Sequence, residues 1–115
     1  MLANLDAIRT AAQVTEQQRP ATAAEQRVLA RWSGWGAVPR VFDDFRAEFA
    51  PVREQLRELL TDVEYAAARR TTINAHYTDP AYVRRMWQLL AGLGFTEGRV
   101  LEPGCGAGTF IGLAA

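Results

Sequence analysis

Glycines at alternate positions, Gly104, Gly106 and Gly108, constrain the fold of this chain more than any other feature. The segment before them, RVLEP at 99–103, is short and apolar, which predicts a buried strand. The residues after them, TFIGLAA, predict the first turns of a helix. A strand, a bare turn and a helix allow a ligand to approach the backbone closely. We therefore expect an α/β unit with a ligand site at the turn.

The rest of the chain consists of segments with helical signals. A Thr and a Glu three residues later form a capping box, and two such pairs predict helix starts at Thr22 and Thr61. Asp79 followed by Pro80 predicts another helix start. Apolar spacing predicts further helices over residues 2–13, 40–50 and 51–60.

Aromatic side chains are concentrated between residues 32 and 49. Phe42, Phe45 and Phe49 would share one face of the 40–50 helix. With Trp32 and Trp35 they could stack on DNA bases, or they could form a hydrophobic core. Aromatic residues at helical spacing usually belong to a core, so we favour the core interpretation.

Charge, cysteine content and hydropathy exclude several classes of protein. The formal net charge is zero, so the chain has no overall basic field to attract nucleic acid. Cys105 is the only cysteine, which excludes an internal disulfide and fits a reducing compartment. No apolar run approaches the roughly 20 residues that span a bilayer. We therefore expect a cytoplasmic protein with no membrane partner.

Ligand classes that use glycine-rich turns can be separated by spacing. A phosphate-binding P-loop requires a lysine after its last glycine, and this chain contains no lysine. A dinucleotide loop requires G-x-G-x-x-G, but Thr109 stands where the third glycine would be. The remaining pattern is acidic-x-Gly-x-Gly-x-Gly, beginning at Glu102. This pattern resembles motif I of class I S-adenosylmethionine-dependent methyltransferases.

The resemblance implies S-adenosylmethionine as a cofactor and a set of residues that bind it. Glu102 would receive the ammonium group of the cofactor, and the bare turn would lie against the ligand. The implied loop residues are Pro103, Gly104, Cys105, Gly106 and Gly108. Cys105 would be a small loop residue rather than a nucleophile, because the motif has no histidine to activate it. The alternative is a tight turn that binds no ligand.

A second motif lies upstream, in NAHYTDPAYVRRMW at 74–87. It resembles the YTP-like segment that adenine-N6 DNA methyltransferases often carry one helix before motif I. The resemblance implies that Tyr77 and Thr78 belong to the cofactor site, with Thr78 near the carboxylate end of the cofactor. The alternative is that Thr78 or Asp79 only caps the helix. His76 has no flanking metal-type residue, so we expect no metal site there.

The ordered set GWG, EY-x-x-A-R, NAHYT and EPGCGAG resembles the N-terminal region of large proteins from phage, plasmids and defence islands. Those proteins join an adenine-type DNA methylase to a Snf2-like helicase. The resemblance implies a helical region over 1–72, followed over 73–115 by the first β/α unit of a truncated Rossmann-like class I methyltransferase domain. It also implies DNA as the partner of the full-length protein.

The sequence lacks the Asn-Pro-Pro-Tyr-like motif that contacts the flipped adenine in such enzymes, and also the acidic residue that binds the cofactor ribose. We therefore expect an N-terminal fragment that is inactive alone, with no catalytic residue assigned. The alternative is a non-catalytic helical module that binds DNA or a partner protein and whose glycine turn is a remnant.

Overall fold

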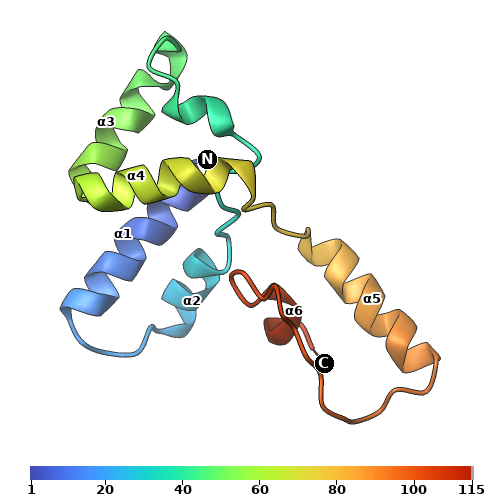
Figure 1. The fold of residues 1–115 in the computed structure, drawn as a ribbon. Coiled ribbons are helices and arrows are strands. Elements are labelled where there is room, and N and C mark those ends of the chain that lie inside the picture. Colours follow the sequence, from blue (N-terminus) through green and yellow to red (C-terminus); the bar gives the residue numbers. More distant parts are fainter. Residues whose placement is uncertain (115) are drawn as a thin grey trace. The chain divides into compact units, whose positions relative to one another are not determined.

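The computed structural model of the chain describes residues 1–114, and these residues form helices without any strand (Figure 1). The α-helices are α1 (Leu2–Glu16), α2 (Ala23–Leu29), α3 (Ala50–Leu59), α4 (Asp62–Arg70), α5 (Pro80–Gly92) and α6 (Thr109–Gly112). Short 3-10 helices are η1 (Pro39–Phe42), η2 (Ala47–Phe49) and η3 (Thr71–Ile73). Within residues 1–114, no helix is long and apolar enough to cross a membrane.

The α/β fold expected from the sequence is therefore wrong. Residues 99–102 are irregular and residues 103–104 form a turn, so the predicted strand is absent and no Rossmann-like β/α unit is formed. A strand is stable only when its backbone groups pair with a neighbouring strand. Nothing else in the described residues is a strand, so this apolar segment has no partner and stays irregular.

The helix starts predicted from capping signals are confirmed. Thr22 accepts a bond from the Glu25 N–H, and Glu25 in turn accepts from the Thr22 N–H at 2.7 Å. The same reciprocal pair is present at Thr61 and Glu64 before α4. Asp79 accepts a hydrogen bond from the Ala81 N–H at 2.7 Å, and Pro80 is the first residue of α5. These are contacts between residues two or three apart, which is why the sequence alone predicts them.

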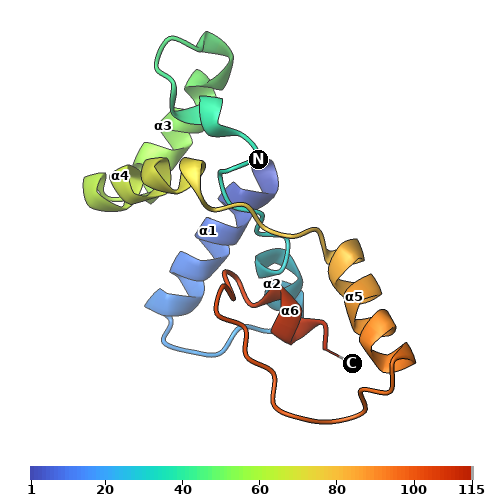
Figure 2. The same ribbon diagram turned by 45° about the vertical axis from the view of Figure 1, so that its right-hand side comes forward.

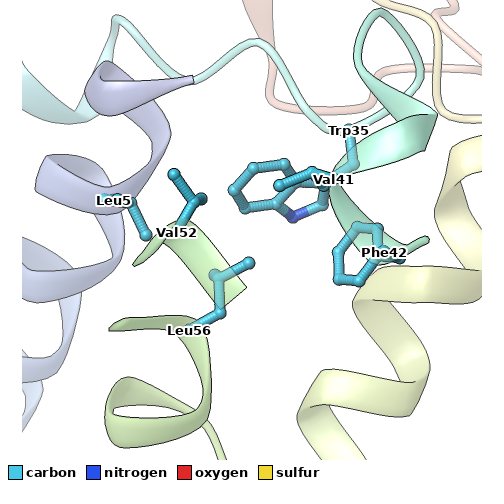
Figure 3. Close-up of a cluster of buried hydrophobic side chains, with 6 residues drawn as sticks. All are labelled: Leu5, Trp35, Val41, Phe42, Val52 and Leu56. Carbon is cyan, nitrogen blue, oxygen red and sulfur yellow. The ribbon is translucent and has the colours of Figure 1, made fainter. Parts of the chain in front are cut away.

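The chain divides into two compact units, Met1–His76 and Tyr77–Ala115. In the first unit, α1 lies beside α2 and α3, and α3 lies beside α4 (Figure 2). Its core consists of six buried side chains, Leu5, Trp35, Val41, Phe42, Val52 and Leu56 (Figure 3). This division does not identify the family of either unit, so a methyltransferase domain that begins at residue 73 stays a prediction.

Aromatic rings of the first unit pack edge to face in this core. The Trp35 ring lies 5.6 Å from that of Phe42, which lies 5.3 Å from that of Tyr65. Trp32 packs against Trp35 from the edge of the core, with ring centroids 5.8 Å apart. The core interpretation is thus confirmed for these tryptophans and for Phe42, because packed rings are not available to stack on bases.

Phe45 contradicts the prediction of one helix over 40–50. Its side chain is 98% exposed, whereas Phe42 is 4% exposed, so the two rings do not share a face. The segment forms η1 and η2 instead, joined by a turn in which Asp43 accepts a hydrogen bond from the Phe45 N–H at 3.0 Å.

Arg53 on α3 explains why this segment is not one α-helix. Its buried guanidinium donates hydrogen bonds to the backbone carbonyls of Val41, Asp43 and Arg46, at 3.3, 2.8 and 3.0 Å. Because these three carbonyls accept hydrogen bonds from a side chain of α3, they do not need the hydrogen bonds of an α-helix, and the segment can keep its turn conformation. The 40–50 sequence pattern contains no sign of this contact.

Asn4 and Gly36 connect distant parts of the first unit. The Asn4 side chain is fully buried; it donates to the Gly34 carbonyl and accepts from the Ser33 N–H at 3.0 Å. A Cβ built on Gly36 would lie 2.6 Å from the Ala75 carbonyl oxygen. The second glycine of GWG is therefore required for close packing against the NAHYT segment.

Candidate functional site

The second unit brings the glycine turn and α5 together. Trp87 on α5 donates a hydrogen bond from its indole N–H to the Phe110 carbonyl at 2.9 Å, which connects α6 to α5. The rings of Trp87 and Phe95 lie 6.5 Å apart and are tilted. These contacts join Phe95 and α6 to the face of α5 that carries Trp87.

The glycine turn is closed by its own backbone. The Gly108 N–H donates to the Cys105 carbonyl at 2.7 Å, and Gly106 and Gly108 have φ values of +50° and +78°. Residues with a Cβ rarely adopt these values, so both positions favour glycine. Residues 103–107 are exposed. The predicted turn therefore exists, and its backbone is accessible, although no strand precedes it.

Tyr77 lies against the turn. A Cβ built on Gly106 would lie 2.7 Å from Cε1 and 3.1 Å from Cδ1 of the Tyr77 ring. Gly106 is thus required by local packing as well as by its φ value. A bulky substitution at Gly106 would displace the ring, so it does not test ligand binding alone.

Glu102 and Gly104 lie on the same side of the turn. Glu102 is partly buried, and its Oε1 atom would be 3.9 Å from a Cβ built on Gly104. Among residues 1–114, apart from the two chain neighbours of Gly104, no other atom lies within 4 Å of that position, so a Cβ there would have open space around it. Pro103, between them, begins the turn and is exposed.

A hollow of about 510 Å³ adjoins the turn, within the usual range of ligand pockets. Glu102 and Cys105 are among the residues that line it. The other lining residues are mainly apolar: Met86, Trp87, Leu90, Gly98, Val100, Phe110, Ile111 and Ala114. The hollow therefore combines one carboxylate and one thiol with mainly apolar walls.

Other residues implicated by the sequence lie as follows. Thr78 is exposed and precedes the helix cap, and the capping bond of α5 comes from Asp79. Cys105 is a free, exposed cysteine whose sulfur lies 3.9 Å from the Gly106 carbonyl. His76 is exposed, and residues 1–114 contain no cluster of three His, Cys, Asp or Glu side chains that could bind a metal.

All eight residues predicted for the cofactor site lie in the second unit, and the Tyr77 ring packs against Gly106. The sequence reasoning missed the packing of Tyr77 on Gly106, because 29 positions separate the two residues and no local pattern relates them. It also missed Phe110 as a wall of the hollow. On α5, Val83 is fully buried, whereas Leu90 is 42% exposed.

Comparisons with protein-family models, with curated proteins and with solved structures find no match to this chain. The resemblance to helicase-fused DNA methyltransferases therefore depends on the motifs quoted above. The function has to be inferred from those motifs together with the geometry of the second unit.

Proposed function

We propose that the second unit binds S-adenosylmethionine, as the cofactor-binding part of an adenine-N6-type DNA methyltransferase of the helicase-fused kind. The observation that supports this proposal is the hollow beside the glycine turn. It is lined by Glu102, by Cys105 of the turn and by apolar side chains that include Trp87 and Phe110.

The chemistry of the cofactor matches this lining. Its amino acid end carries an ammonium group, for which a partly buried carboxylate is a strong acceptor. Its adenine ring is aromatic, and the faces of that ring would contact the apolar walls of the hollow. The three glycines of the turn carry no side chain that would keep the ligand away from the backbone.

The proposed activity of this chain is cofactor binding rather than methyl transfer. The sequence contains no Asn-Pro-Pro-Tyr-like motif, so no residue is assigned to bind the adenine or to receive its amino group. DNA would be the partner of an enzyme that supplies this motif, and the cytoplasm would be its compartment.

Isothermal titration of the full chain with S-adenosylmethionine tests the proposal. Glu102→Gln should weaken binding at least about tenfold, because it removes a charge-assisted hydrogen bond. Gly104→Val should abolish binding with an unchanged circular dichroism spectrum, because the nearest atom to a Cβ at this position, beyond the chain neighbours, is Glu102 Oε1 at 3.9 Å. Gly92→Ala is the matched control, since beyond the chain neighbours and the backbone of α5 itself no atom of residues 1–114 lies within 4 Å of a Cβ at that position. Unchanged affinity in Gly104→Val, or no binding by the unmodified chain, would refute the proposal.

A second candidate is a non-catalytic helical module that binds DNA or a partner protein. Large apolar side chains of the second unit are exposed, notably Leu89, Leu93, Val100, Leu101 and Ile111. Surfaces of this kind are frequently covered by other proteins. A chain that fails to bind S-adenosylmethionine but loses an interaction with DNA or protein on Leu93→Ser would favour this candidate.

A further inference from the structure

The Tyr77 ring occupies the space directly beside Gly106. A Cβ on Gly106 would lie well inside van der Waals contact of two ring carbons, at 2.7 and 3.1 Å. Such an approach leaves no room for a side chain or a ligand group between the ring and the turn. The ring therefore contacts one side of the turn, while residues 103–107 remain exposed on other sides.

The backbone conformation of the glycine turn is held by few contacts of its own. Gly106 has φ +50° and Gly108 has φ +78°, with one hydrogen bond, from the Gly108 N–H to the Cys105 carbonyl, closing the turn. Glycine is the residue with the most backbone freedom, so a turn that contains Gly104, Gly106 and Gly108 has many alternative conformations in solution. A packed aromatic ring reduces that number.

We propose that Tyr77 is a positioning residue for the glycine turn: its ring packs on Gly106 and keeps the turn in the conformation that receives the ligand. This inference depends on the proposed function of the second unit, and it assigns Tyr77 a role other than contact with the cofactor. The physical basis is preorganisation, because a turn that is already ordered loses less conformational entropy on binding.

The first test needs no ligand. In the full chain, the ring current of Tyr77 should shift the NMR resonances of Gly106, and backbone order parameters of residues 104–108 should report a rigid turn. Tyr77→Ala should remove the shift and lower the order parameters, whereas Tyr77→Phe keeps the ring and should preserve both. Tyr82→Ala is the matched control, because Tyr82 lies on α5 and is 68% exposed. Unchanged Gly106 resonances and order parameters in Tyr77→Ala would overturn the inference.

The second test measures binding of S-adenosylmethionine. Tyr77→Ala should weaken binding about tenfold and Tyr77→Phe less than about twofold, if the ring rather than the hydroxyl is responsible. Equal weakening in Tyr77→Phe and Tyr77→Ala would indicate a contact through the hydroxyl and would overturn positioning. Gly106→Ala should also weaken binding, and adding Tyr77→Ala to it should weaken binding no further, because the turn is already displaced.

The two tests separate the two proposals. A chain that does not bind S-adenosylmethionine but shows the ring-current shift and its loss in Tyr77→Ala refutes the proposed function and supports the positioning of the turn by Tyr77. A chain that binds the cofactor equally well with Tyr77→Ala supports the proposed function and overturns the positioning role.

Discussion

Replacing Arg53 by methionine would test what keeps the 39–49 segment in its turn conformation. Arg53 is 7% exposed and donates to three backbone carbonyls of that segment. Methionine fills a comparable volume with an unbranched apolar chain but donates no hydrogen bond. Because the segment carries Val41 and Phe42 into the core, its loss of anchoring should lower the stability of the whole first unit.

The magnitude follows from the three hydrogen bonds. Each contributes on the order of 1 kcal/mol net, so their sum is about 3 kcal/mol. The ion pair of Arg53 with Asp44, at 3.5 Å, adds little, because the Asp44 side chain is 66% exposed and solvent screens the pair. Water can reach the carbonyls whose bonds are only partly buried, so we expect a loss of about 2–3 kcal/mol in the free energy of unfolding.

Arg57→Met provides a matched control. Arg57 pairs with the same Asp44 oxygen at 3.6 Å, but its side chain is 62% exposed. It also lies over the Tyr65 ring, 5.3 Å from the ring centroid. Exposed ion pairs and cation–π contacts are each worth at most about 1 kcal/mol, so this variant should lose clearly less stability.

Urea unfolding of the full chain, followed by tryptophan fluorescence, measures both variants, since Trp35 is buried beside Phe42. Arg53→Met should lower the midpoint without changing the slope. Equal losses in the two variants, or a loss below about 0.5 kcal/mol in Arg53→Met, would refute the idea that buried bonds to the carbonyls stabilise this segment.

Three further changes test the first unit. Gly36→Ala should destabilise it by about 1–3 kcal/mol in urea, because its Cβ would lie 2.6 Å from the Ala75 carbonyl oxygen; a neutral result would show that the two segments separate at no cost. Asn4→Ala should cost about 2 kcal/mol in the same assay, since it leaves the buried Gly34 carbonyl and the Ser33 N–H without their partner, and a loss under about 0.5 kcal/mol would count against that account. The hydrogen bond from the Arg19 guanidinium is the main reason why the pKa of Glu25 falls from 4.5 to about 2, and hydrogen bonds from Thr22 contribute further. Its stabilising effect on α2 should therefore be present above pH 4.5 and disappear as the pH falls towards 2, which an NMR titration of the Glu25 carboxyl measures; a pKa near 4.5 would contradict the pairing.

Predictions that depended on neighbouring residues succeeded. The caps at Thr22, Thr61 and Asp79 were readable from the sequence because donor and acceptor lie within three positions of each other. The glycine turn was readable for a similar reason, since Gly106 and Gly108 permit backbone angles that other residues rarely adopt. The membership of Trp35 in the core followed from composition and spacing.

Predictions that depended on distant partners failed. The RVLEP segment is not a strand, because β-structure requires hydrogen bonds to another strand and the described residues contain none. Periodicity suggested one face for Phe42 and Phe45, but the backbone between them bonds to Arg53 and turns the second ring outward.

The sequence by itself thus determined where helices begin and where the backbone can turn, because these properties depend on contacts along a few residues. Tertiary structure decided which polar groups are buried, as with Asn4 and the carbonyl of Gly34, 30 positions away. It also decided that the Tyr77 ring packs on Gly106. The physical reason is that burial and close packing are set by which segments meet in space, and many arrangements of helices are compatible with the same local signals.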